Sequence, residues 1–365
     1  MAQQHLDPTD PLAGPVTGDA LADYLRAQAT EFLRALRLHR ETGGNAANGT
    51  GPQGPGSPGD PVDPARALRR AVRRISGSLH TFRPLLDADW SESMRPELAW
   101  LSGTLAMEHA YSARLERLLL ALHRLSGTVF PTQPKGATVG AAQAGGSGPP
   151  SPPAAPDRGN LTVGAAKAGA LLERQLTLAR TRAHSTALQA LGSSRFHAVA
   201  DNIAVLASEV PLVPTAATTA LHPHATAAQE RLTDAVSALP LVTAGHPYNA
   251  EALIHGLSPD PAPHPQDTSW HQVRLLLRLH RYAREVLQGT NAPVDVRLLT
   301  AGRALDRHRD ASEAAAAAAQ AARTPRIAPA TAYALGVLHA DQRHEVEAAR
   351  FAFQQSWQKQ AVGTP

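Results

Sequence analysis

Residues 66–83 restrict the fold more than any other stretch, because their apolar and basic side chains both repeat at helical spacing. The stretch contains six arginines and no acidic residue. Taking about 100° per residue, five of the arginines share one stripe of a helix: Arg66, Arg69, Arg70, Arg73 and Arg74. The opposite stripe is apolar: Leu68, Val72, Ile75, Leu79 and Phe82. The stretch therefore predicts a helix that packs on one side and collects positive charge on the other.

The arginine stripe carries no acid that could relieve its own repulsion. Like charges at i,i+4 spacing destabilise an isolated helix by a few tenths of a kcal/mol per pair. A polyanion would supply the missing counter-charge. On this helix alone, a solvated surface face in an arginine-rich proteome is an equally good interpretation.

Composition predicts an all-α protein. Hydrophobic residues make up 43% of the chain and aromatic residues only 4%, and β-branched residues seldom run together. The absence of cysteine excludes disulfides, thiolate catalysis and cysteine-based zinc sites. The first residues lack the basic and apolar regions of a secretion signal, and no run approaches the length of a membrane span. We therefore expect a cytoplasmic protein.

Three stretches have the proline- and glycine-rich composition of linkers: 41–64, 131–159 and 256–267. Between them, helical patterns cover nine ranges: 18–40, 64–86, 91–125, 161–191, 194–208, 226–239, 268–288, 293–322 and 329–358. Asp63 with Pro64, Ser91 with Glu92, and one of residues 267–269 carry the signals of helix N-termini. We expect one domain over 18–358, with an N-terminal helical half (18–210) and a C-terminal half (221–358).

The arginine-rich helix is partly repeated later in the chain. A shift of 205 residues places Arg69 over Arg274 and Arg73 over Arg278, with Arg66 over His271. In the later helix, His271, Arg274, Arg278 and Arg281 form a narrow stripe, and apolar residues cover most of the remaining circumference. Such a helix is mostly buried, and its arginines must pair with acids or face a hydrated cavity. Since acids are absent nearby, we predict one cationic helix from each half, meeting across a positive groove.

Two motifs carry a family resemblance. The pattern H-x-x-R-x-x-x-R-R-L-R-x-x-L-x-x-F-R is matched by Arg69, Arg73, Arg74, Leu79, Phe82 and Arg83, with Ile75 in a leucine position. The pattern H-x-x-R-x-x-x-K-R-L-R-Y is matched by His271, Arg274, Arg281 and Tyr282, with Arg278 for lysine. LDRHRD, with Leu305, His308 and Asp310, is similar to an LGEHQD segment, SSRFHAV to an S-P-R-F step, and residues 332–357 to a closing helix. In these features the chain resembles the CHAD family, the conserved histidine α-helical domain, over nearly its whole length.

The chain departs from that pattern at several positions. Arg66 stands where the family has its first histidine, and Ser76 and Leu279 stand where it has basic residues. The R-D pair of the family's third helix is His109-Ala110 here. These departures predict weaker or altered binding, although Arg66 and Arg70 keep the stripe cationic.

The resemblance implies two helical bundles related by a pseudo-two-fold axis, and a basic central surface that binds inorganic polyphosphate. Guanidinium groups suit this role, because they bind phosphate oxygens bidentately and stay charged at physiological pH. We expect a non-enzymatic protein without cofactor or metal, located on or near polyphosphate granules, with granule proteins as further candidate partners. The predicted binding residues are Arg66, Arg69, Arg70, Arg73, Arg74, His271, Arg274, Arg278, Arg281 and His308.

Two other classes of function stay open. A nucleic-acid-binding protein would also need basic stripes, but these carry almost no aromatic residues for base stacking. An enzyme acting on phosphate chains would need a compact carboxylate cluster for metal, whereas the 31 acids are scattered. Phosphoryl relay through His271 or His308 lacks an evident acid or base partner. His222 and His224 sit in a proline-containing turn without a third ligand, which predicts no metal site.

Overall fold

The computed structural model describes residues 16–45, 63–127, 156–246, 257, 264–289 and 295–358. Over these residues the protein is helical, and its one β-type pairing is an isolated bridge between Leu86 and Leu212. This confirms the all-α prediction. No helix in the described ranges is long and apolar enough to cross a membrane. The long helices are α1 (Gly18–Asn45), α2 (Pro64–Thr81), α3 (Ala88–Ser126), α4 (Pro156–Leu191), α5 (Ser194–Ser208), α6 (His222–Ser237), α9 (Thr268–Gln288), α10 (Val296–Ala322) and α11 (Pro329–Gln358), with a short α7 (Leu241–Ala244).

Three helices, α5, α9 and α11, have the bounds predicted from the sequence. α3 begins earlier than predicted, because Asp87 and not Ser91 caps it and accepts a hydrogen bond from the Trp90 amide. α1 and α4 extend into stretches that were predicted as linkers, to Asn45 and from Pro156. Most of the predicted linker residues lie outside the part of the chain that the structure describes.

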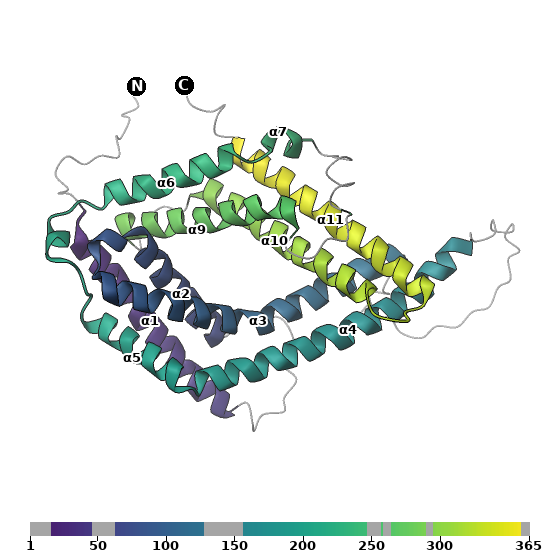
Figure 1. The fold of residues 1–365 in the computed structure, drawn as a ribbon, viewed down its shortest axis with the longest axis horizontal. Coiled ribbons are helices and arrows are strands. Elements are labelled where there is room, and N and C mark those ends of the chain that lie inside the picture. Colours follow the sequence, from purple (N-terminus) through teal and green to yellow (C-terminus); the bar gives the residue numbers. More distant parts are fainter. Residues whose placement is uncertain are drawn as a thin grey trace, which may run out of the picture.

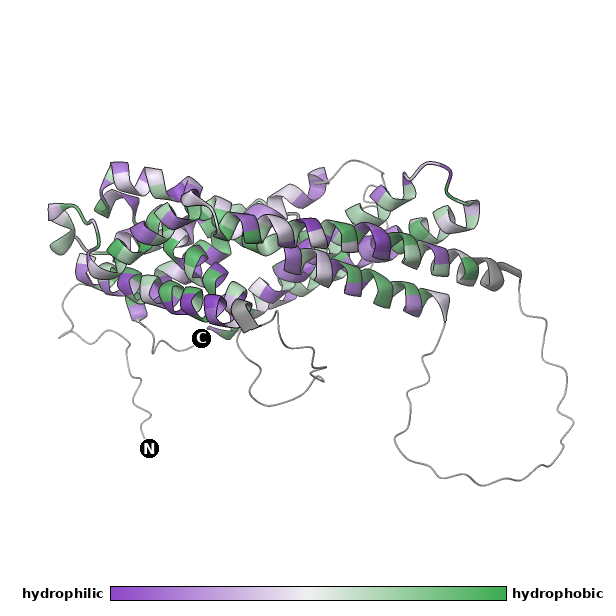
Figure 2. Ribbon diagram, turned by 90° about the horizontal axis from the view of Figure 1, so that it is seen from below, coloured by the Kyte–Doolittle hydropathy of each residue, from purple (hydrophilic) through white to green (hydrophobic). Residues whose placement is uncertain are grey.

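The helices are arranged around the centre of an elongated molecule (Figure 1). At one end, α1, α2 and α5 pack together with the start of α3. At the other end, α3 and α4 lie beside α10 and α11. Helices α9 and α10 face α2 and α3 across the middle. Hydrophilic and hydrophobic residues alternate along most helices (Figure 2), as expected for amphipathic helices that each bury one stripe.

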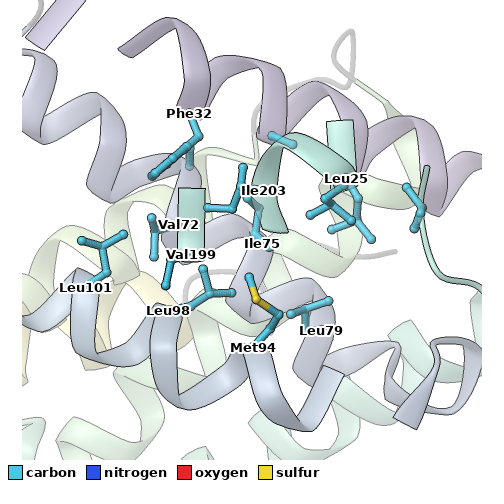
Figure 3. Packing of buried hydrophobic residues seen from close by; sticks show 14 of the residues in the cluster. Leu25, Phe32, Val72, Ile75, Leu79, Met94, Leu98, Leu101, Val199 and Ile203 are labelled. Carbon is cyan, nitrogen blue, oxygen red and sulfur yellow. The ribbon is translucent and has the colours of Figure 1, made fainter. Parts of the chain in front are cut away.

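The apolar stripe of α2 is buried, as its spacing predicts: Leu68, Val72, Ile75, Leu79 and Phe82 are each 0% exposed. Around it, Phe32 of α1, Leu98 of α3 and Ile203 of α5 complete the first hydrophobic core (Figure 3). Packing on three sides holds α2 in one rotational orientation. Its opposite stripe therefore points in a fixed direction.

Two further cores lie elsewhere. One joins α3 and α4 to α10 and α11, and the other joins α6, α7, α9, α10 and α11 around Trp270 and Phe353. The first core also takes in Ala283 and Val286 of α9. Two of the three cores thus combine the N-terminal and C-terminal parts of the chain, so residues 18–210 and 221–358 do not have separate interiors.

A close contact between α2 and α9 fixes how the two arginine-rich helices meet. A Cβ atom added to Gly77 would lie only 2.5 Å from Cδ2 of Tyr282. Glycine at this position lets the Tyr282 ring pack directly on the α2 backbone. The arginines that precede these two residues on each helix are brought to the same region of the molecule.

Candidate functional site

A cavity of about 330 Å³ lies between α2, α3, α9 and α10. We call it the arginine cavity. Six of its lining residues are arginines and two are aspartates: Arg69, Arg73, Arg114, Arg117, Arg274, Arg309, Asp306 and Asp310. The wall contributed by α3 consists largely of small residues, Ala106, Ala110 and Ala113, together with His109. Small side chains here leave room between α3 and the basic helices.

The arginine stripe of α2 divides between two surfaces. At about 100° per residue, Arg69 and Arg73 fall on one side of Arg66, and Arg70 and Arg74 on the other. Arg69 and Arg73 line the arginine cavity, whereas Arg70 and Arg74 line a separate groove against α1. This corrects the prediction of a single stripe, because five residues span too wide an arc to face one partner.

Arg74 and Arg66 differ from the other arginines of the α2 stripe: Arg74 forms an ion pair, and Arg66 lies at the edge of the cavity. Arg74 Nε donates to Glu285 at 2.8 Å, and Glu285 also accepts from the Tyr24 hydroxyl at 2.9 Å. Arg74 is thereby neutralised away from the cavity. Arg66 is exposed at the cavity edge, where its Nη2 lies 3.4 Å from Nε2 of His109.

The α9 stripe also has members in different settings. Arg274 lines the arginine cavity and forms an ion pair of 2.6 Å with Asp306 of α10. Arg278 lines a neighbouring cavity, which it shares with Arg73. Arg281 lines neither of these cavities. The structure thus brings Arg69, Arg73 and Arg274 together, with Arg278 adjoining them through Arg73.

Three half-buried arginines, Arg69, Arg73 and Arg278, have no described carboxylate within 4.0 Å of their guanidinium nitrogens. Burial lowers the pKa of each, and neighbouring arginines lower it further. The pKa values of Arg73 and Arg278 fall to about 10. Both stay protonated at neutral pH, so positive charge is concentrated here without a counter-ion. We call these three the unpaired arginines.

The remaining arginines of the cavity are paired. Glu313 accepts hydrogen bonds from Arg114 and from Arg309, whose Nε lies 2.8 Å from the carboxylate. Arg117 Nε donates to Gln342 at 2.6 Å. Burial raises the pKa of Asp310, the second aspartate of the wall. One side of the cavity is therefore charge-compensated. The side formed by Arg69 and Arg73 of α2, which Arg278 adjoins from the neighbouring cavity, is not.

His308 lies in the core and not in the cavity, which corrects its predicted place in the binding site. It is 1% exposed, its ring stacks on Trp270 at 5.6 Å, and Arg350 Nε donates to its Nε2 at 3.3 Å. Burial lowers its pKa to about 4. His271 is half-buried beside it, with the ring centres 5.4 Å apart, and burial lowers the pKa of His271 as well.

Sequence reasoning missed the group that surrounds His308, which we call the core network: Asp267, His308, Ser312, Arg343 and Arg350. Asp267 is 0% exposed and bonds Arg343 at 2.8 Å and Arg350 at 2.7 Å. Its place before a helix suggested an N-cap, but its side chain makes no capping bond. One signal was available, because Arg343 and Arg350 share the helical face of Val346 and Phe353, which is apolar.

The cavity suits a ligand with several negative charges. Arginines from four helices can each bind oxygen atoms in a bidentate way, and restricted access to water strengthens such contacts. Among the described residues, no three histidine, aspartate or glutamate side chains gather as a metal site would require. His222 and His224 belong to no such group.

Comparisons with known proteins point in one direction. The family model of the CHAD domain matches residues 56–296. Among solved structures, PptA from Streptomyces chartreusis is similar to this chain, with 68% sequence identity and a TM-score of 0.74. The match covers 95% of this chain and 100% of that one. No curated protein matches the chain.

Proposed function

This chain belongs to the CHAD domain family, and from that premise we propose that it binds inorganic polyphosphate in the arginine cavity and at the adjoining Arg278. The observation that carries the proposal is the set of unpaired arginines, Arg69, Arg73 and Arg278. A charged group held away from water costs free energy unless an opposite charge meets it. A chain of phosphates would meet these three residues together.

The proposed contact surface is narrower than the full predicted set. It consists of the unpaired arginines, Arg66 at the edge and Arg274, with His271 beside them. Arg114, Arg117 and Arg309 extend it along α3 and α10. Arg70, Arg74 and Arg281 lie outside it, and His308 supports it from the core.

We propose binding without catalysis. The acids of the cavity wall form ion pairs with its arginines: Asp306 with Arg274 and Asp310 with Arg309. Phosphate-chain hydrolysis would need carboxylates free to hold a metal or activate water. We further propose that residues 18–358 act as one domain, in which α2 and α9 represent two helical halves related by a pseudo-two-fold axis. A place on cytoplasmic polyphosphate granules follows from the ligand.

Nucleic acid is the main rival ligand. A duplex is far wider than a cavity of about 330 Å³ allows, so it would reach only the outer arginines. A single strand gains much of its affinity from bases stacked on aromatic rings. Among the described residues, no Phe, Tyr or Trp lines the arginine cavity, and Tyr282 is the one such residue that lines the adjoining cavity at Arg278. Both features favour an inorganic chain.

The test is a titration with long-chain polyphosphate over a series of salt concentrations. It compares the wild type with Arg73→Glu/Arg278→Glu, and a length-matched DNA duplex and single strand serve as competitors. Arg180→Glu/Arg182→Glu is the matched control, because it reverses the same charge at exposed positions of α4. We expect tight, salt-sensitive binding that only the cavity variant loses and that DNA does not displace. Equal loss in both variants, or displacement by DNA, would overturn the proposal.

A further inference from the structure

A second and larger cavity, of about 830 Å³, adjoins the arginine cavity between α2, α3 and α9. The two share Arg73 and Ala106 as lining residues. Arg73 and Arg278 stand where the larger cavity meets the basic region. Its volume falls within the range of small-molecule sites. We call it the leucine cavity, for the residues described next.

The walls of the leucine cavity are mostly apolar. Helix α9 contributes Leu275, Leu276 and Leu279, and α3 contributes Pro96 and Ala99. Leu275 is 51% exposed, and neither Leu275 nor Leu279 belongs to any of the three hydrophobic cores. These leucines therefore offer apolar surface to the cavity and not to the interior of the protein.

Two of the positions where the chain departs from the motifs that it resembles line this cavity. Ser76 of α2 and Leu279 of α9 stand where those motifs have basic residues. In this chain the positive surface therefore ends at Arg73 and Arg278, and uncharged residues continue the wall. Glu92, an acid of the cavity wall, is itself paired with Arg83 at 2.8 Å and Arg95 at 3.2 Å. The two unpaired arginines thus dominate the charge at the junction.

An inorganic chain has no carbon to place against leucine, so the leucine cavity does not suit polyphosphate itself. We propose that it binds the organic part of a small phosphate ester, of about the size of a nucleoside triphosphate, whose phosphates contact Arg73 and Arg278. The leucines and Pro96 would pack against the planar or aliphatic part of the ligand, which they shield from water. This inference rests on the proposed function, because the same arginines must bind phosphate.

The experiment compares adenosine triphosphate with inorganic triphosphate, two probes with equal numbers of phosphates, by calorimetry on the full chain. Inorganic triphosphate has the higher charge density, so electrostatics alone favours it. We expect adenosine triphosphate to bind about tenfold more tightly, because only it has a part that can bury the leucines. Leu275→Gln/Leu279→Gln should remove this preference and leave the affinity for inorganic triphosphate unchanged. The matched control is Leu178→Gln/Leu188→Gln, which changes leucines that are 51% and 53% exposed on α4.

A second variant tests the same cavity by filling it. Ala99 is an exposed residue of the α3 wall, so Ala99→Trp adds bulk without disturbing a buried contact. It should weaken adenosine triphosphate and spare inorganic triphosphate. The inference is overturned if inorganic triphosphate binds as tightly as the nucleotide, or if both cavity variants keep the nucleotide preference. Failure of the proposed function differs, because long-chain polyphosphate would then not bind the wild type at all.

Discussion

Buried and half-buried arginines occur in two settings in this protein. In the core network, Arg343 and Arg350 are 3% and 4% exposed, and both bond the carboxylate of Asp267. In the arginine cavity, Arg69 and Arg73 have no carboxylate partner within ion-pair distance among the described residues. In the core network, arginine therefore stabilises the fold through ion pairs. In the arginine cavity, the arginines repel one another and destabilise it.

The difference separates stability from binding. A buried charge that loses its partner destabilises the folded state by several kcal/mol, so the core network must stay intact. Removal of a half-buried charge that has no partner changes the free energy of unfolding little. An unpaired arginine destabilises the folded state, and a bound anion offsets this destabilisation. For this reason the cavity, and not the core network, is the proposed site. Four variants test this comparison.

The largest effect is expected from Asp267→Asn, which leaves the buried Arg343 without counter-charge and leaves Arg350 with Glu347 alone. We expect a loss of about 3–5 kcal/mol in the free energy of unfolding, measured by denaturant titration. Asp306→Asn is the control. Its partner Arg274 is 18% exposed and Asp306 itself 58%, so solvent screens the pair and the loss should stay below about 1 kcal/mol. Equal losses in the two variants would remove the distinction between network and cavity.

The second effect concerns acid stability through His308. Its pKa is about 4 in the folded protein against a usual 6.5, because burial and Arg350 oppose its charge while Asp267 favours it. Between pH 4 and pH 6.5, His308 is therefore protonated in the unfolded chain and neutral in the folded protein. Stability from this source is complete above pH 6.5 and is lost as the pH falls toward 4, by up to about 3 kcal/mol.

The measurement is the free energy of unfolding at pH 7 and at pH 4.5 for the wild type and His308→Gln. The variant should start less stable and lose less on acidification. His222→Gln, which changes an exposed histidine, should behave as the wild type. An unchanged pH dependence in His308→Gln would show that another group, such as the neighbouring His271, carries the acid sensitivity.

The third effect is the inverse of the first. Arg73→Gln/Arg278→Gln should lower the affinity for polyphosphate about a hundredfold and reduce the slope of log affinity against log salt by about 1.4, for two lost contacts. Stability should stay equal or rise, since the variant removes mutual repulsion and the cost of burial. Binding is measured by titration at several salt concentrations and stability by thermal unfolding. A variant that loses both together would place these arginines with the network.

Much of the fold was predictable because its signals are local. The bounds of α9 follow from the proline-rich segment before Thr268 and from Gly289 after it, whose φ of 69° ends the helix. The buried stripe of α2 follows from spacing alone. The repeat and the motifs also brought out Arg69, Arg73, Arg274 and Arg278, all of which line the two cavities.

The charge pairing was not predictable, because it joins distant parts of the chain. Asp267 meets Arg343 across 76 residues, and Arg74 meets Glu285 across 211. Helical periodicity says which residues share a stripe but not which neighbour each edge of the stripe will face. For α2, one edge of the stripe lines the arginine cavity, whereas Arg70 and Arg74 line the groove against α1, where Arg74 also pairs with Glu285 of α9.

The smallest effect tests the boundary between paired and unpaired arginines. Glu313 holds both Arg114 and Arg309 at the cavity wall, so it competes with any bound anion for them. Glu313→Gln should free two guanidinium groups and raise the affinity for polyphosphate about threefold to tenfold, with a steeper salt dependence. Glu230→Gln, at an exposed position of α6, controls for the change in net charge. Weaker binding in Glu313→Gln would mean that the glutamate positions its arginines for the ligand. In that case the paired side of the cavity, too, would be built for binding.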